Sequence, residues 1–221
     1  MTDNLHLTVI DRVAYITVDR PQKRNAMSTA MWRALIEYVH QLTDAHDVCA
    51  VVLRGSSGSF CAGGDLSEIR GDDAEAARAY RQLAENAVIA FGRLAQPTFA
   101  EIDGPCLGAG CSLALACDIR IAAPTAQFAI PSLRNGLTYE APFVRRLTDT
   151  IGSGPSGLLL LAGERWNGTE AAAYGLVDRC TDDPSSTIER AVDYLRGASH
   201  ATVAETILAI RGTHRTQTAT T

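Results

Sequence analysis

The sequence is poor in lysine, in positive charge and in long apolar runs, and each shortage excludes a class of protein. Lys23 is the only lysine of the 221 residues, and the formal net charge of -5 argues against a general nucleic-acid-binding surface. No apolar run reaches the roughly 18 to 20 residues that a membrane span requires, so no membrane partner is expected. The opening "MTDNLHLTVIDR" has no charged start followed by an apolar core, so we expect no signal peptide and a cytoplasmic location.

Cysteine is present, but without the spacing of a metal site. None of the six cysteines belongs to a CxxC motif, and most lie in apolar segments. Buried free thiols are therefore favoured over disulfides or a metal centre, and we expect no bound metal ion. The six are Cys49, Cys61, Cys106, Cys111, Cys117 and Cys180.

The apolar pattern predicts one α/β domain. "LHLTVI" and "VAYITV" alternate between apolar and polar residues around Asp11-Arg12, which predicts a β-hairpin. Ser28 is a candidate N-cap for a helix that ends near residue 46, and an acidic segment over 73–94 predicts a second helix. "VCAVVLR" is typical of a strand buried on both faces, and "PTFAEID" is the next strand. Alternating strands and helices indicate an α/β core.

The C-terminal part is expected to be mainly helical, with "LVDRC" as a last strand. We expect a core domain over 1–182, a short C-terminal helical region over 183–212 and a disordered tail over 213–221. The helical segments predicted after residue 140 are 143–151, 154–162, 169–175, 185–196 and 202–210.

Two glycine-rich turns each follow a strand and begin a helix. "VVLR" leads into "FCAGGDL", and "FAEID" leads into "GPCLGAG" and a buried helix over 109–116. Backbone N–H groups at such turns lack partners, and the helix dipole adds partial positive charge. Two of these N–H groups aimed at one point would form an oxyanion hole. Each turn alone could equally cradle a phosphate or only permit close helix–sheet packing.

Five motifs in a fixed order carry a family resemblance: "RPQKRNAMS", "FCAGGDLSEI", "GPCLGAGCSLALACDIRIAA", "AQFAIPSLRNGL" and "GERWNGTEAAAYGLVDR". From about residue 5 to residue 180 the sequence resembles the crotonase superfamily, also called the enoyl-CoA hydratase/isomerase family. The resemblance implies a spiral of repeated ββα units, here with a shortened C-terminal helical region. It also implies an acyl-CoA substrate that brings coenzyme A, no permanently bound cofactor, and a homotrimer or a dimer of trimers.

The same resemblance implies an oxyanion hole for a thioester enolate. By position in the motifs, its two donors are the backbone amides of Gly64 and Ala109. Alanine at position 109 keeps the N–H group, so the hole is retained. Two preorganised donors would stabilise the charge that develops on a thioester oxygen.

The resemblance further implies where coenzyme A binds. The adenine is expected to meet backbone groups of "CAGGDL", and the phosphates a basic residue of "RPQKR". A local basic cluster that meets a polyanion fits a chain of net negative charge. Alternatively, Arg20 and its basic neighbours form a solvated turn. The residues expected to contact CoA are Lys23, Arg24, Ala26, Ala62, Asp65 and Leu66.

The two glutamates that hydratases of this family use as acid and base are absent. Ser112 and Ser132 stand at their positions, where we expect them to line the substrate site, and a serine hydroxyl cannot act as base unless another group activates it. Glu140 matches the position where some isomerases and a dehalogenase of the family carry an aspartate. Burial in an acyl pocket would raise its pKa, and Tyr139 is an adjacent donor. Alternatively, Glu140 is a partly exposed loop carboxylate or the N-terminal charge of the next helix.

These residues predict an enzyme that isomerises the double bond of an enoyl-CoA, with Glu140 moving the proton. A decarboxylase or hydrolase of acyl-CoA would use the same oxyanion hole with less need for a base. The competing class is a non-catalytic acyl-CoA-binding protein.

Overall fold

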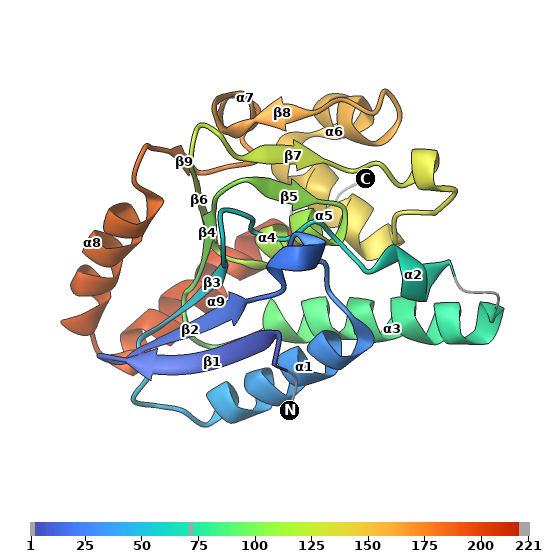
Figure 1. The fold of residues 1–221 in the computed structure, drawn as a ribbon. Helices are drawn as coiled ribbons and strands as arrows, with labels where there is room; N and C mark the ends of the chain where they lie inside the picture. Colours follow the sequence, from blue (N-terminus) through green and yellow to red (C-terminus); the bar gives the residue numbers. More distant parts are fainter. Residues whose placement is uncertain (1–2, 71–72, 217–221) are drawn as a thin grey trace.

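The computed structural model describes residues 3–70 and 73–216, with side chains up to residue 212, and it opens with the predicted hairpin (Figure 1). Strands β1 (Leu5–Ile10) and β2 (Val13–Val18) pair antiparallel. The turn residues Asp11 and Arg12 have φ values of 47° and 68°. Two consecutive left-handed residues are the requirement of a tight type I′ turn, so the two-residue connection is confirmed.

Six strands form the main sheet, in the order β1-β2-β3-β4-β6-β9. All neighbours from β2 onward run parallel. A second sheet has the order β5-β7-β8 and lies beside the β6–β9 end of the main sheet, in the upper part of Figure 1. The strands after the hairpin are β3 (Ala50–Gly55), β4 (Thr98–Ile102), β5 (Pro105–Leu107), β6 (Ile119–Ala122), β7 (Gln127–Ala129), β8 (Trp166–Asn167) and β9 (Arg179–Cys180).

The chain repeats a strand–strand–helix unit. β4 of the main sheet passes into β5 of the second sheet and then into α4 (Ala109–Ala116). β6 passes in the same way into β7, and α5 (Ala141–Ile151) follows. After β3, a parallel bridge between Cys61 and Cys106 brings the chain to the edge of the second sheet before α3 (Ala74–Phe91). The expected spiral of ββα units is confirmed.

The main sheet is buried on both faces at β3, which explains the unbroken apolar run of this strand. Val51 and Leu53 face a large core formed with α1 (Thr29–Thr43), α3 and α4. Ala50 and Val52 face a smaller core formed with α8 (Pro184–Arg196). Successive side chains of a strand point to opposite faces, so an apolar residue is needed at every position.

The remaining helices of the described residues comprise one short helix before α1 and five that follow the first glycine turn. Within the described ranges, no helix combines the length and apolarity needed to cross a bilayer. These helices are η1 (Pro21–Lys23), α2 (Leu66–Ile69), η2 (Leu133–Asn135), α6 (Ser153–Leu160), α7 (Gly168–Ala173) and α9 (His200–Thr216).

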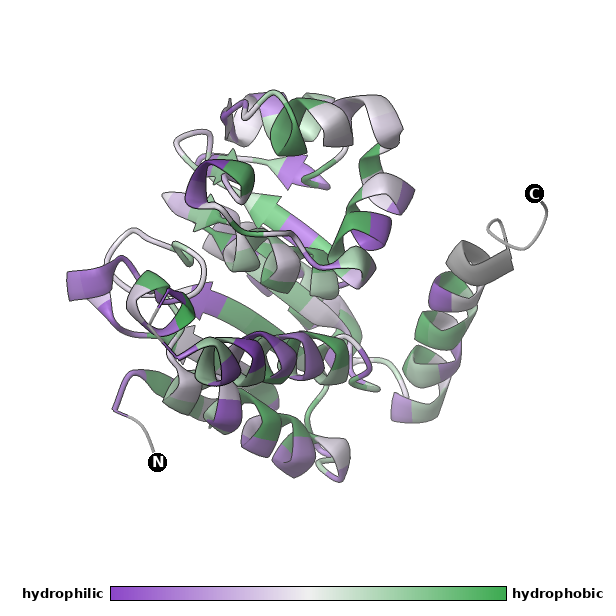
Figure 2. Cartoon of the chain, turned by 90° about the vertical axis from the view of Figure 1, so that its right-hand side faces the viewer, coloured by the Kyte–Doolittle hydropathy of each residue, from purple (hydrophilic) through white to green (hydrophobic). Residues whose placement is uncertain are grey.

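Helix α9 stands beside the rest of the chain in Figure 2 and is held by an ion pair. Arg211 donates through Nε and Nη2 to the two carboxylate oxygens of Asp118, each at 2.8 Å, and through Nη1 to the carbonyl of Leu94 at 2.7 Å. The helix continues past residue 212, where we expected the helical region to end. Residues 217–221 of the expected tail lie outside the described residues.

Candidate active site

The two glycine-rich turns lie side by side in the structure. The N–H of Leu107 donates to the carbonyl of Cys61 at 2.9 Å, and the N–H of Cys61 donates to the carbonyl of Pro105 at 2.8 Å. A Cβ at Gly110 would sit 2.3 Å from the Cys61 carbonyl oxygen. A Cβ at Gly63 would sit 3.5 Å from the nitrogen of Ala109. Only glycine permits this contact between the first turn and the start of α4.

The amide of Gly64 is directed by its pairing with the loop before α1. The N–H of Met27 donates to the carbonyl of Gly63 at 2.8 Å, and the N–H of Asp65 donates to the carbonyl of Met27 at 2.8 Å. In a planar trans peptide the C=O and the N–H point in opposite directions. Because the carbonyl of Gly63 faces Met27, the N–H of Gly64 points away from it.

The amide of Ala109 points out of the N-terminus of α4. Gly108 caps this helix with φ 52° and ψ −115°, and its carbonyl accepts from the N–H groups of Cys111 at 2.9 Å and Ser112 at 3.3 Å. The N–H of Ala109 belongs to the same peptide unit and therefore points the opposite way. Across the part of the chain that the structure describes, no hydrogen bond uses the N–H of Gly64 or Ala109 as donor.

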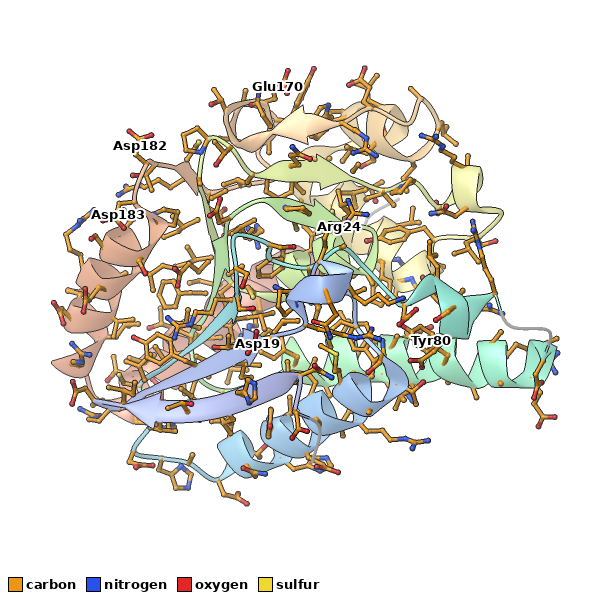
Figure 3. All side chains as sticks on the ribbon, viewed as in Figure 1. Asp19, Arg24, Tyr80, Glu170, Asp182 and Asp183 are labelled. Atoms are coloured by element: carbon orange, nitrogen blue, oxygen red, sulfur yellow. The ribbon has the colours of Figure 1, made fainter. Side chains whose placement is uncertain are left out.

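The predicted CoA-contacting residues come from two neighbouring segments. The N–H of Ala62 donates to the carbonyl of Arg24 at 3.0 Å. The carbonyl of Ala26 accepts from Nη1 of Arg20 at 3.1 Å, and Ala26 itself is buried. Lys23 and Arg24 are exposed at the end of η1, where Figure 3 labels Arg24, and Leu66 is 41% exposed at the start of α2. The structure therefore places these segments against each other, with both basic side chains facing solvent.

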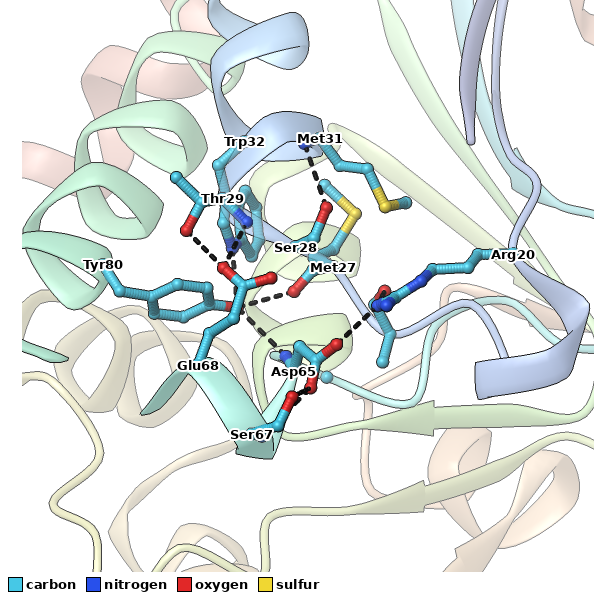
Figure 4. Close-up of polar contacts among 12 residues, drawn as sticks. Arg20, Met27, Ser28, Thr29, Met31, Trp32, Asp65, Ser67, Glu68 and Tyr80 are labelled. Atoms are coloured by element: carbon cyan, nitrogen blue, oxygen red, sulfur yellow. Dashed lines mark hydrogen bonds and ion pairs between the residues drawn. The ribbon is translucent and has the colours of Figure 1, made fainter. Parts of the chain in front are cut away.

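Asp65 is engaged within the protein by its side chain. Its Oδ2 lies 2.7 Å from Nη1 of Arg20, and its Oδ1 accepts from the N–H of Ser67 at 3.0 Å, which caps α2 (Figure 4). Burial alone would raise the pKa of Asp65, but hydrogen bonds from Ser67 and Arg20 outweigh it and lower the pKa to about 2. The carboxylate thus stays ionised and fixes the turn, which leaves backbone groups for a ligand.

Ser112 and Tyr139 form a buried hydroxyl pair. Their oxygens lie 2.6 Å apart, and the Tyr139 hydroxyl also lies 3.4 Å from the carbonyl of Gly108. Burial raises the pKa of Tyr139 well above its ordinary value, so the hydroxyl stays protonated and can donate. The sequence places both residues in the site but gives no signal of this contact.

Glu140 is half-buried at the N-cap of α5, and its side chain makes no capping hydrogen bond. Burial raises its pKa, the negative charge of Glu85 raises it further, and Arg81 acts in the opposite direction. Both of these charged residues lie on α3, the helix whose Tyr80 hydroxyl would be 2.7 Å from a Cβ at Gly64. Glu140 and Gly64 therefore border the same helix.

Ser132 is separate from the hydroxyl pair. It stands at the N-cap of η2 and is partly exposed, and among the described residues its side chain makes no hydrogen bond. The turn that it begins is tied to α2, because Nη2 of Arg70 donates to the carbonyl of Asn135 at 2.7 Å and to its side-chain oxygen at 3.0 Å. Within the described residues, no hydrogen bond joins the two serines that replace the expected glutamates.

Tyr80 is a residue that our sequence reasoning did not single out. It lies in the apolar stripe of α3 with Ala77, Ala84 and Phe91, so its spacing predicts only core packing. A tyrosine in such a stripe nevertheless buries a hydroxyl that needs hydrogen-bond partners. That requirement is the feature of the sequence that points to a role beyond packing.

Residues 9–206 match the sequence model of the family described as Enoyl-CoA hydratase/isomerase. The chain belongs to this family. The match covers both glycine turns, the hydroxyl pair and Glu140, and so includes every site residue discussed above.

Relatives and solved structures agree with this family membership. A probable enoyl-CoA hydratase, echA8, of Mycobacterium tuberculosis is 35% identical over 171 residues, which are 76% of this chain and 65% of the relative. The short-chain-enoyl-CoA hydratase of Clostridium acetobutylicum is 30% identical over 190 residues, which are 86% of this chain and 72% of the relative. An enoyl-CoA hydratase/isomerase family protein from Hyphomonas neptunium superposes with a TM-score of 0.91 at 31% identity, over 99% of this chain and 84% of that structure. The chain spans 65% of the length of the first curated relatives that it matches.

Proposed function

We propose that this chain binds an acyl-CoA thioester and stabilises its enolate with the amides of Gly64 and Ala109. The observation that carries the proposal is the pair of N–H groups without acceptors, directed from two turns that touch each other. Each donor is already oriented by the carbonyl of its own peptide unit, so no reorganisation is needed when charge develops. Donors of this kind contribute about 3–4 kcal/mol each to a transition state.

The favoured reaction is double-bond isomerisation with Glu140 as acid and base. The carboxylate removes a proton from the carbon α or γ to the thioester, and the electron pair moves onto the thioester oxygen between the two amides. The protonated Glu140 then returns the proton to the other carbon, so the double bond shifts and the carboxylate is restored. The raised pKa of Glu140 brings its proton affinity closer to that of a useful base near neutral pH.

The contacts of Ser112 favour isomerisation over hydration. Addition of water across the double bond needs an acid and a base near the acyl group. The Ser112 hydroxyl is instead paired with the neutral hydroxyl of Tyr139, and no carboxylate takes part in this pair.

Coenzyme A would lie along the two segments that precede α1 and α2. Lys23 and Arg24 would meet its phosphates, because both are exposed at the edge of the turn that contacts Ala62. Backbone groups from Ala62 to Leu66 would receive the adenine. The site needs no further cofactor for this proton transfer, since the coenzyme arrives with the substrate.

The test is a comparison of the wild-type chain with Glu140→Gln on trans-3-hexenoyl-CoA. We expect conversion to the 2-enoyl isomer in the wild type and a loss of at least about 100-fold in the variant. Glu189→Gln is the matched control, because it removes an exposed carboxylate on α8, which packs on the other face of the main sheet. Tight binding with no turnover in either protein would instead support a non-catalytic binder. Thioester cleavage or loss of CO₂ from a malonyl-type thioester would support the hydrolase or decarboxylase.

Hydration is the second candidate, because the relatives at 30–35% identity carry the name enoyl-CoA hydratase. Its test is water addition to crotonyl-CoA. Turnover as fast as isomerisation, and insensitive to Glu140→Gln, would overturn the assignment of Glu140.

A further inference from the structure

We infer that Tyr80 is a positioning residue for the oxyanion hole: its buried hydroxyl fixes the direction of the Gly64 amide. This inference rests on the proposed function and adds a residue outside the motifs that carry the family resemblance. Tyr80 is 4% exposed and lies on α3, with its hydroxyl directed toward Met27 and Asp65 (Figure 4). It is therefore too buried to be a contact residue for the acyl group and acts through the backbone.

All the hydrogen-bonding capacity of the Tyr80 hydroxyl is used. The hydroxyl donates to the carbonyl of Met27 at 2.7 Å, and it accepts from Nε1 of Trp32 at 2.9 Å and from the N–H of Asp65 at 3.1 Å. A hydroxyl has one proton and two lone pairs, so these three contacts saturate it. Its position is thus set by α1 as well as by α3.

Met27 transmits this position to Gly64. The carbonyl of Met27 is shared by the Tyr80 hydroxyl and the N–H of Asp65, and the N–H of Met27 holds the carbonyl of Gly63. The Gly63 carbonyl and the Gly64 N–H belong to one rigid peptide unit, so whatever fixes the first also aims the second. Tyr80 therefore stands two hydrogen bonds away from the proposed oxyanion donor.

Gly64 also lies next to Tyr80, with no room for a side chain between them. A Cβ at Gly64 would lie 2.7 Å from the tyrosine hydroxyl and 2.7 Å from Cδ1 of Ile69. The tyrosine hydroxyl therefore borders Gly64, and Met27 holds the preceding carbonyl. Replacement of Tyr80 by phenylalanine removes this neighbouring hydroxyl and its hydrogen bonds and leaves the ring in place.

The decisive measurement is the apparent pKa of acetoacetyl-CoA bound to the protein, read from the near-ultraviolet absorbance of its enolate at saturating protein. This probe reports stabilisation of a thioester enolate whatever reaction the chain catalyses. In the wild type we expect the bound pKa to fall below that of the free thioester. In Tyr80→Phe we expect it to lie about one pH unit above the wild-type value, which is a tenfold loss of enolate stabilisation.

Tyr38→Phe is the matched control. Tyr38 is 5% exposed, against 4% for Tyr80, and its hydroxyl donates to the carbonyl of Leu5 at 2.8 Å, so the variant loses the same group at a site remote from Gly64. Trp32→Phe is the second variant, should Tyr80→Phe fail to fold, because it keeps the hydroxyl and removes the indole donor that orients it. We expect a smaller change in the same direction.

The outcomes distinguish a failure of the role of Tyr80 from a failure of the proposed oxyanion hole. An enolate signal that is equal in wild type, Tyr80→Phe and Trp32→Phe would overturn the role of Tyr80 and leave the oxyanion hole intact. An equal loss in Tyr38→Phe and Tyr80→Phe would show a general effect of lost stability and would likewise overturn it. Bound acetoacetyl-CoA without any enolate in the wild type would overturn the oxyanion hole itself, and the role of Tyr80 with it.

Discussion

The hydroxyl oxygen of Ser112 lies 2.6 Å from the hydroxyl oxygen of Tyr139, and both residues are buried. This contact occupies the place where the family resemblance expects a glutamate. A neutral pair fixes the start of α4, because Tyr139 also reaches the carbonyl of Gly108, the peptide unit that carries the Ala109 amide. Ser112, which stands where an acid is expected, is thus part of the support for the proposed oxyanion donor Ala109.

The hydrogen bond between Ser112 and Tyr139 predicts that substitutions of the two residues have non-additive effects on the free energy of unfolding. Ser112→Ala and Tyr139→Phe each leave one buried hydroxyl with a poorer partner, so each should lower the free energy of unfolding by about 1–3 kcal/mol. The double variant should cost less than the sum of the two, with a coupling of about 1 kcal/mol. Urea denaturation of the four proteins measures this coupling. Strict additivity would show that the two hydroxyls do not interact in solution.

The raised pKa of Glu140 predicts that Glu140→Gln raises stability while it lowers activity. Its folded pKa is raised, so its contribution to stability is complete below the unfolded value of about 4.3 and is lost as the pH rises through the folded pKa. Glu140→Gln should therefore be more stable than the wild type at pH 7, with the difference vanishing at low pH. Thermal unfolding between pH 4 and 8 checks this, with isomerase activity assayed in parallel. A variant less stable at pH 7 would mean that the folded protein stabilises the ionised carboxylate, which contradicts a raised pKa.

The same carboxylate predicts the pH profile of the reaction. Glu140 must be deprotonated to remove a proton, so kcat/KM for trans-3-hexenoyl-CoA should fall on the acid side with an apparent pKa above that of an ordinary glutamate. A profile that is flat down to the ordinary glutamate range would exclude Glu140 as the base.

Much of the fold and part of the site could be predicted from the sequence. The hairpin at Asp11-Arg12 and the buried run of β3 follow from local patterns, because turn chemistry and burial leave a direct mark on residue type. The adjacency of the turns at Gly64 and Ala109 followed from the motifs rather than from any single turn. Oligomer formation, as a homotrimer or a pair of trimers, stays a prediction that sedimentation would test.

The contacts that support the site could not be predicted. Tyr80 occupies an ordinary core position of α3, and only the three-dimensional path of the Met27 segment gives its hydroxyl a role. Likewise, the partner of Arg211 is Asp118, 93 residues away, and no local pattern encodes such a pairing. Long-range hydrogen bonds depend on how the elements pack, while sequence patterns report mainly burial and local conformation.

The Arg20–Asp65 ion pair predicts a loss of stability in acid. The folded pKa of Asp65 is lowered to about 2, so its contribution is present above the unfolded value of about 3.9 and is lost as the pH falls through the folded pKa. A shift of this size corresponds to about 2–3 kcal/mol. Asp65→Asn should therefore unfold more easily at pH 6 and lose less stability between pH 5 and pH 2. Urea midpoints across that range measure it, and parallel curves for both proteins would refute the ion-pair account.

Gly110 and Gly157 predict opposite outcomes for the same substitution. Both lie in helices, but a Cβ at Gly110 would sit 2.3 Å from the carbonyl oxygen of Cys61, while a Cβ at Gly157 would meet nothing within 4 Å. Gly110→Ala should therefore lower the free energy of unfolding by about 1–3 kcal/mol or more, since the obstacle is backbone. It should also weaken enolate binding, because the first glycine turn must move away from Ala109. Gly157→Ala should instead raise stability by about 0.5–1 kcal/mol through helix propensity. Urea denaturation and the bound acetoacetyl-CoA signal check both variants, and a Gly110→Ala protein with normal stability and a normal enolate signal would show that the two turns need not touch.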